Sequence, residues 1–154
     1  MADTTGPGRC PECGAEIPPD GACRDNFHAL LAMEWQIPGG PGEEVHFLAV
    51  ATYGLQHPDS MGFTMETLIG LRAAVADVLA GSVSMEDIRV RMRTVAPATG
   101  RVTRRPGDAT PRWTKRSWPV VITHVTAGGF EHYGQRVRGW AELVLASGGE
   151  LTPH

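Results

Sequence analysis

Three cysteines near the N-terminus constrain the fold of this 154-residue chain more than any other feature. Cys10 and Cys13 frame a Cys-Pro-Glu-Cys-Gly turn, and Cys23 follows a connection rich in proline and glycine. Three cysteines cannot pair completely, and two thiolates at the Cys-x-x-Cys spacing can point at one metal ion. The sequence therefore predicts a zinc knuckle at the N-terminus. The alternative is a set of buried or redox-active thiols without metal.

Apolar residues at helical spacing predict that the rest of the chain is mainly α-helical. Thr64 has the character of a helix N-cap, and Gly81 has that of a C-terminal stop. We predict a small helical bundle in a single domain over residues 10–150, after a disordered tail over residues 1–9. The predicted helices cover residues 24–35, 43–57, 64–81, 84–92 and 130–148, and residues 120–125 form a strand or a short helix.

The connection between the first two predicted helices indicates which residue completes the metal site. A short Pro/Gly-rich turn joins them, so the second helix should run back antiparallel and place His57 near Cys23. His28, one turn into the first helix, is the alternative fourth ligand. His46 begins the second helix about 16 Å from His57, which makes it a poor ligand for the same ion. Three thiolates and one imidazole fill a tetrahedron, so the expected zinc is structural.

A second candidate site lies on the second predicted helix. His46, Tyr53 and His57 fall at positions i, i+7 and i+11, which places them on one face. Glu34 or His28 of the first helix can face them, and the resulting pocket would suit acid/base chemistry or a second metal ion. The alternative is that His46 and Tyr53 are packing residues that form hydrogen bonds across the helix pair.

The segment over residues 96–119 is rich in proline, glycine, threonine and positive charge, which predicts a long, basic, irregular loop. It has room for a short strand pair, 101–103 with 112–114. Cations beside Trp113 and Trp118 have the composition of a nucleic-acid contact, and such loops also bind protein partners. We favour instead a solvated loop whose cations pair with acidic residues elsewhere. The candidate polyanion contacts are Arg101, Arg104, Arg105, Arg112, Lys115 and Arg116.

Charge and hydropathy argue against two classes of protein. The chain has 14 Lys and Arg against 17 Asp and Glu, and its formal net charge of −3 does not suit a surface that binds polyanions as a whole. No apolar run reaches the roughly 20 residues of a membrane span, and the first residues lack the layout of a signal peptide. We therefore expect a cytoplasmic protein without a membrane partner.

Several motifs together resemble a group of uncharacterised bacterial proteins known only as a domain of unknown function. They are the Cys-Pro-Glu-Cys-Gly-Ala segment, the third cysteine, and a His-led helix that ends in Leu-Gln-His-Pro. His124 stands where that family has an acidic residue after a Trp-Pro pair. The resemblance implies a bacterial source and supplies no activity. It covers most of the chain and includes the pairs Trp118-Pro119 and Trp140-Ala141.

These features together favour a small, non-enzymatic, zinc-stabilised helical protein that binds a partner or acts as an adaptor. Two alternatives follow from the other candidate sites. One is a metal-dependent enzyme that uses the helix face of His46, Tyr53 and His57. The other is a nucleic-acid-binding protein that uses the basic loop over residues 101–116.

Overall fold

Helices dominate the fold of residues 8–93, 101–114 and 118–153, which are the residues that the computed structural model describes. The mainly α-helical prediction is confirmed, and each predicted helix is present with small shifts at its ends. Residues 120–125, predicted as a strand or a short helix, contribute to a short helix. The helices are α1 (Cys23–Gln36), α2 (Glu43–Gln56), α3 (Met65–Ala80), α4 (Met85–Arg93), α5 (Ile122–Thr126) and α6 (Tyr133–Ser147).

Local sequence signals explain where several helices begin and end. The Thr64 hydroxyl accepts a hydrogen bond from the Thr67 amide at 3.1 Å, and Gly81 adopts a φ of 70° just after α3. Both features satisfy backbone groups that a helix end leaves free. At the start of α4, Ser84 and Asp87 each bond the other's amide through their side chains, which is the expected reciprocal capping.

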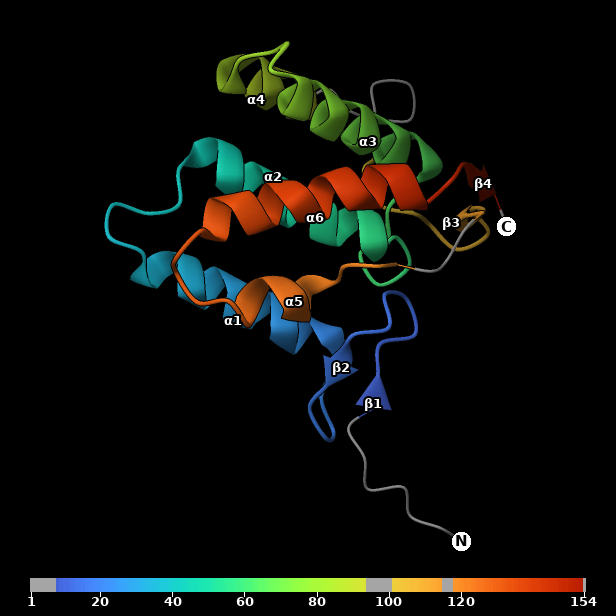
Figure 1. Ribbon diagram of the computed structural model, residues 1–154. Helices are drawn as coiled ribbons and strands as arrows, with labels where there is room; N and C mark the ends of the chain where they lie inside the picture. The colour runs from blue at the N-terminus through green and yellow to red at the C-terminus, as the bar shows by residue number, and fades with distance from the viewer. Residues whose placement is uncertain (1–7, 94–100, 115–117, 154) are drawn as a thin grey trace, which may run out of the picture.

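The helices pack in pairs, as Figure 1 shows: α2 lies beside α6, α3 beside α4, and α5 beside α1. The pair of α2 and α6 forms the middle, and α3 contacts both of its helices. Helices α1 and α2 run in opposite directions, as predicted (Figure 1). None of the described helices is long and apolar enough to cross a bilayer. The fully buried core includes Leu30, Leu48, Leu55, Leu68, Val75, Ile122, Val137 and Trp140.

Two short antiparallel strand pairs complete the regular structure. β1 (Gly8–Arg9) pairs with β2 (Glu16–Ile17) and encloses the Cys-x-x-Cys turn. The predicted disordered tail is therefore wrong at residues 8 and 9, because these residues pair with β2, and residues 1–7 lie outside the described part of the chain.

The strand pair for which the basic loop has room, 101–103 with 112–114, is not the pairing that the structure shows. β3 (Pro111–Trp113) pairs with β4 (Leu151–Pro153) near the C-terminus. Thr103 instead forms an isolated bridge with Phe63. The end of α6 brings β4 next to β3. β3 therefore pairs with β4, about 40 residues away in the sequence, and not with residues 101–103.

Candidate metal centre

Three cysteines and one histidine meet where the start of α1 approaches the end of α2. The ligand atoms of Cys10, Cys13, Cys23 and His57 all lie within 4.8 Å of one another, and all four residues are buried. The structure thus brings together the four residues that the sequence analysis named as candidate ligands. His28, the alternative fourth ligand, is exposed on α1 and is not a member of the cluster.

The local backbone explains how the cysteines converge. The amide of Cys10 donates to the Ala15 carbonyl at 2.8 Å, and the amide of Gly14 donates to the Cys10 carbonyl at 2.9 Å. Gly14 has a φ of 85°, a conformation that favours glycine. Cys23 is the first residue of α1, and His57 directly follows α2. The antiparallel helices therefore carry the last two donors to the tight turn that holds the first two.

The sulfur geometry suits a shared ion. The Sγ atoms of Cys13 and Cys23 are 3.7 Å apart, which is too long for a disulfide bond of about 2.05 Å. A tetrahedral zinc with bonds of about 2.3 Å to sulfur has an edge of about 3.8 Å between ligands. Two donors also face the sulfurs: the Ala15 amide lies 3.4 Å from Cys13 Sγ, and Asn26 Nδ2 lies 3.6 Å from Cys23 Sγ. Such donors stabilise thiolates around a metal.

The imidazole of His57 has one nitrogen fixed and one available. Its Nδ1 lies 2.7 Å from the carbonyl oxygen of Tyr53, so Nδ1 carries the hydrogen and donates it. Its Nε2 is buried and has no hydrogen-bond partner within the described part of the chain. A buried nitrogen without a hydrogen-bond partner costs free energy, and a cation bound by Nε2 and the three sulfurs would remove that cost.

The close contacts within the cluster shift the pKa values of His57, Cys10 and Cys13. Burial lowers the pKa of His57, but contacts with Cys10 and Cys23 outweigh burial and raise it to about 10. Hydrogen bonding between the thiols of Cys13 and Cys10 lowers the pKa of Cys10 and raises that of Cys13. The nearby sulfurs thus favour a positive charge at the His57 ring. A divalent cation would take the place of the protons of the cluster and stabilise all three thiolates together.

Tyr53 lies at this end of α2, away from His46. Its ring stacks on His57 with centroids 3.9 Å apart and on Phe27 with centroids 4.4 Å apart. Burial is the main cause that raises the pKa of its hydroxyl. The sequence-based pocket that combined Tyr53 with His46 and Glu34 is therefore wrong for Tyr53, because seven residues of helix separate it from His46 by about 10 Å.

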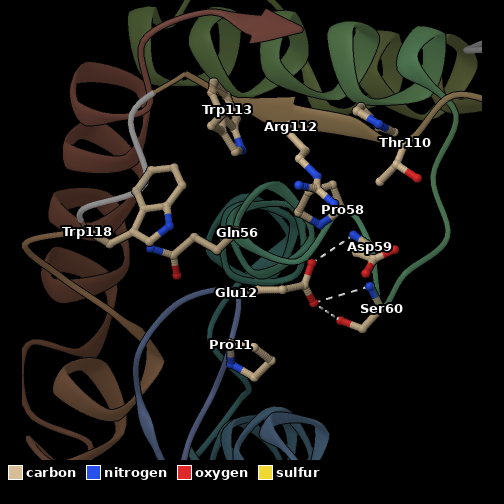
Figure 2. Close-up of a pocket in the computed structure, with 11 residues that line it drawn as sticks. Pro11, Glu12, Gln56, Pro58, Asp59, Ser60, Thr110, Arg112, Trp113 and Trp118 are labelled. Atoms are coloured by element: carbon tan, nitrogen blue, oxygen red, sulfur yellow. Dashed lines mark hydrogen bonds between the residues drawn. The ribbon is translucent and has the colours of Figure 1, made fainter. Parts of the chain in front are cut away.

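Glu12, between the first two cysteines, ties the knuckle to the turn after α2. Its carboxylate accepts hydrogen bonds from the amides of Asp59, at 2.8 Å, and Ser60, at 3.2 Å, and from the Ser60 hydroxyl (Figure 2). A cavity of about 280 Å³ opens beside this contact. Arg112 and Trp118 line the same cavity (Figure 2). Sequence reasoning missed Glu12, although its position between two ligands was a usable signal.

Gln56 is a second residue that sequence reasoning missed. Its side-chain oxygen accepts from Trp140 Nε1 at 3.2 Å, and its side-chain nitrogen donates to the Val120 carbonyl at 2.9 Å. The preceding Leu55 is fully buried, and its carbonyl accepts from Trp113 Nε1 at 2.6 Å. The Leu-Gln-His-Pro segment therefore joins the end of α2 to the C-terminal third of the chain as well as to the knuckle.

Glu34 and His46 meet at the opposite end of α2. The carboxylate oxygen Oε1 of Glu34 lies 2.7 Å from His46 Nδ1, and Oε2 accepts from the Tyr133 hydroxyl at 2.7 Å. The sequence suggested that Glu34 faces His46, but it gave no indication of Tyr133, which lies 99 residues from Glu34. His46 is not a ligand of the cysteine cluster, as expected.

The basic loop uses two of its arginines in ion pairs. Arg101 lies 2.8 Å from Asp108, and Arg104 lies 3.0 Å from Asp59. The backbone amide of Arg105 donates to Asp108 as well, and these contacts lower the pKa of the Asp108 carboxyl. Arg112 is exposed, and Lys115 and Arg116 lie outside the described residues. The pair of Arg104 with Asp59 is of the kind that the favoured solvated-loop prediction expects, because Asp59 lies outside the loop, whereas Arg101 pairs with Asp108 within the loop.

His124 occupies a capping position at the start of α5. Its Nδ1 accepts a hydrogen bond from the Val121 amide at 3.0 Å, three residues earlier. An acidic side chain makes the same bond at this position of a helix. His124 thus makes the capping bond that an acidic residue would make at this position.

Comparison with known proteins agrees with these motifs. Residues 8–148 match DUF5946, a family of unknown function. No curated protein and no solved structure matches the chain. The matched segment begins in β1 and ends just after α6, so it contains the cysteine cluster and both ends of α2. Because the match spans nearly the whole sequence, the chain belongs to this family of unknown function, DUF5946.

Proposed function

We propose that this protein holds one structural zinc ion and acts as a non-enzymatic binding or adaptor protein. The ligands would be Cys10, Cys13, Cys23 and His57. The observation that carries the proposal is the buried Nε2 of His57, which lacks a hydrogen-bond partner among the described residues and lies among the three cysteine sulfurs. A site of three thiolates and one imidazole has the donor types that zinc prefers.

The expected role of the ion is to stabilise the fold. Four protein ligands complete a tetrahedron and leave no position for a reacting water molecule. The ligands come from the β1–β2 turn, the start of α1 and the residue after α2, so one ion would join three segments. Zinc that binds only the folded chain adds its binding free energy to folding.

Metal analysis of the purified protein tests the proposal. We expect one zinc per chain, and we expect Cys13→Ser and His57→Ala to lose zinc and thermal stability together. His28→Ala is the matched control, because His28 is an exposed histidine on α1 that should keep full zinc. A native protein that contains no metal and melts at the same temperature with and without a strong chelator would overturn the proposal.

The binding role is supported by surfaces away from the metal ligands. Trp35 exposes 88% of its surface, which is unusual for the largest apolar side chain. Exposed tryptophans are among the residues that contribute most to binding at interfaces. Trp35 follows Glu34, whose carboxylate bonds His46, and both line an open pocket beside the turn between α1 and α2.

A further inference from the structure

A buried carboxylate connects three helices at the end of α2 that is far from the cysteines. Glu34 of α1 is only 4% exposed, and both of its oxygens are occupied at 2.7 Å, one by His46 of α2 and the other by Tyr133 of α6. The three side chains thus form a continuous chain of hydrogen bonds from the bundle interior to its surface. We call this chain the Tyr133–Glu34–His46 relay.

The relay fixes which nitrogen of His46 holds a hydrogen. A carboxyl group is normally more acidic than an imidazolium, so the proton between Glu34 and His46 stays on Nδ1. The ionised carboxylate only accepts, and it receives hydrogen bonds from both Nδ1 and the Tyr133 hydroxyl. In the neutral imidazole, Nε2 is then a hydrogen-bond acceptor. The side chain of His46 is 55% exposed, so this acceptor is within reach of a ligand.

An open pocket of about 480 Å³ adjoins His46. Leu31 and Trp35 of α1 supply its apolar side chains, and the glycine-rich turn before α2 supplies much of its rim. A pocket of this size suits a small molecule, and apolar walls with one placed polar group are typical of ligand sites. The aromatic side of Trp35 favours a flat aromatic ligand.

The charges around the pocket select a neutral ligand. A cation is disfavoured, because Glu34 has both oxygens occupied and Glu43 already has a cationic partner, Arg89, at 3.1 Å from its Oε1. An anion would need a cationic side chain, and neither lysine nor arginine is among the described residues that line the pocket. What remains is an apolar molecule with one hydrogen-bond donor for His46 Nε2.

We propose that this pocket is a binding site for a small aromatic alcohol, whose hydroxyl donates to Nε2 of His46 while its ring packs against Leu31 and Trp35. Glu34 is a positioning residue, because it sets the tautomer and orientation of His46 without contacting the ligand. The proposal rests on the binding function proposed above and names the class of ligand. It does not use the metal, so each can fail without the other.

A titration with two ligands of the same shape tests the site on the zinc-loaded full chain. The probes are 2-naphthol, which carries the hydroxyl, and 2-methylnaphthalene, in which a methyl group replaces it. Binding is followed by the NMR shift of the Trp35 indole N–H. We expect 2-naphthol to bind about three- to tenfold more tightly than 2-methylnaphthalene, which is the effect of one hydrogen bond. Equal affinities, or no saturable shift with either probe, would overturn the proposal.

Variants assign the difference to the relay. His46→Leu should remove the preference for 2-naphthol, whereas His28→Leu, which changes an exposed histidine outside the pocket, should leave it intact. Nitrogen-15 shifts of His46 in the wild type should show Nε2 without a hydrogen and Nδ1 with one; the opposite tautomer contradicts the proposal. If the wild-type protein contains one zinc per chain but does not bind 2-naphthol, only the ligand-site proposal fails. If the native protein binds 2-naphthol but contains no zinc, only the metal proposal fails.

Discussion

His57 and His46 stand at opposite ends of α2, and each fixes its imidazole through Nδ1. His57 donates to the Tyr53 carbonyl within its own helix, and its Nε2 is buried among sulfurs. His46 donates to the Glu34 carboxylate across the helix pair, and more than half of its side chain is exposed beside a pocket. The same bonding pattern therefore leaves one Nε2 buried among sulfurs and the other beside an open pocket.

The difference between the two ends comes from what surrounds the free nitrogen. At the His57 end, three buried thiols complete a closed donor set, and Glu12 holds the knuckle against the turn after α2. At the His46 end, the described surroundings are the carboxylates of Glu34 and Glu43, apolar side chains and a glycine-rich turn. We infer that the first end stabilises the fold and the second is available for recognition.

The largest predicted effect separates the two histidines directly. His57→Ala should lower the free energy of unfolding by about 4 kcal/mol, because it leaves buried thiolates without a complete ligand set. His46→Ala should cost only about 1 kcal/mol, since it removes one hydrogen bond at a half-exposed site. Chemical denaturation of each variant as purified, compared with the zinc-loaded wild type, measures both values. Similar losses from the two variants would contradict the assignment of a structural and a recognition end.

Glu34→Gln should lower the free energy of unfolding by about 2 kcal/mol, because a hydrogen-bonded charge becomes a neutral amide between His46 and Tyr133. Its zinc content should stay at the wild-type level, since the relay does not contact the cysteine cluster. Denaturation and metal analysis of the same sample check both statements. A loss of zinc from this variant would show that the two ends are coupled.

Tyr133→Phe should cost about 1.5 kcal/mol at neutral pH, because Glu34 loses a buried donor. It should also change the response to alkali. Burial, and then the bond to Glu34, raise the pKa of Tyr133 above its ordinary value of 10.0. Above pH 10 the unfolded chain releases this proton while the folded chain keeps it, so wild-type stability falls as pH rises. The decline should be shallower in the variant, as denaturation between pH 9 and about 11 will show.

Glu12→Gln should lower the free energy of unfolding by about 1 kcal/mol. In the wild type both carboxylate oxygens accept hydrogen bonds, from the amides of Asp59 and Ser60, whereas glutamine has one acceptor oxygen. The four metal ligands stay in place, so zinc content should be unchanged while a chelator removes zinc faster. Glu16→Gln, in neighbouring β2, is the matched control for a loss of charge. Equal chelation rates for wild type and Glu12→Gln would show that the Glu12 contact does not restrain the knuckle.

The smallest predicted effect touches neither end of α2. His124→Asp should raise the free energy of unfolding by about 0.5 kcal/mol, because a carboxylate accepts the Val121 amide and carries negative charge at the start of α5. Zinc content and naphthol binding should remain those of the wild type. A destabilised variant would mean that the imidazole of His124 makes a contribution other than capping.

The sequence alone determined what depends on short spacing along the chain. Apolar periodicity predicted the helices, and Thr64, Gly81 and Ser84 marked ends that the structure confirms. The meeting of the three cysteines with His57 was also predictable, because the Cys-x-x-Cys turn is local and a short turn between two helices favours an antiparallel arrangement. That geometry brings His57 back to Cys23 and keeps His46 away.

Only the tertiary structure decided which distant residues meet. Tyr53 shares a helix face with His46 but does not lie near Glu34. Two turns of helix separate Tyr53 from His46, so its ring packs at the cysteine end of α2, against Phe27 and His57. Tyr133 reaches Glu34 only because α6 packs along α2, and β3 pairs with β4 because α6 ends beside it. Spacing fixes contacts within a few turns of a helix, whereas contacts across the bundle depend on how whole helices pack, which no local pattern in the sequence records.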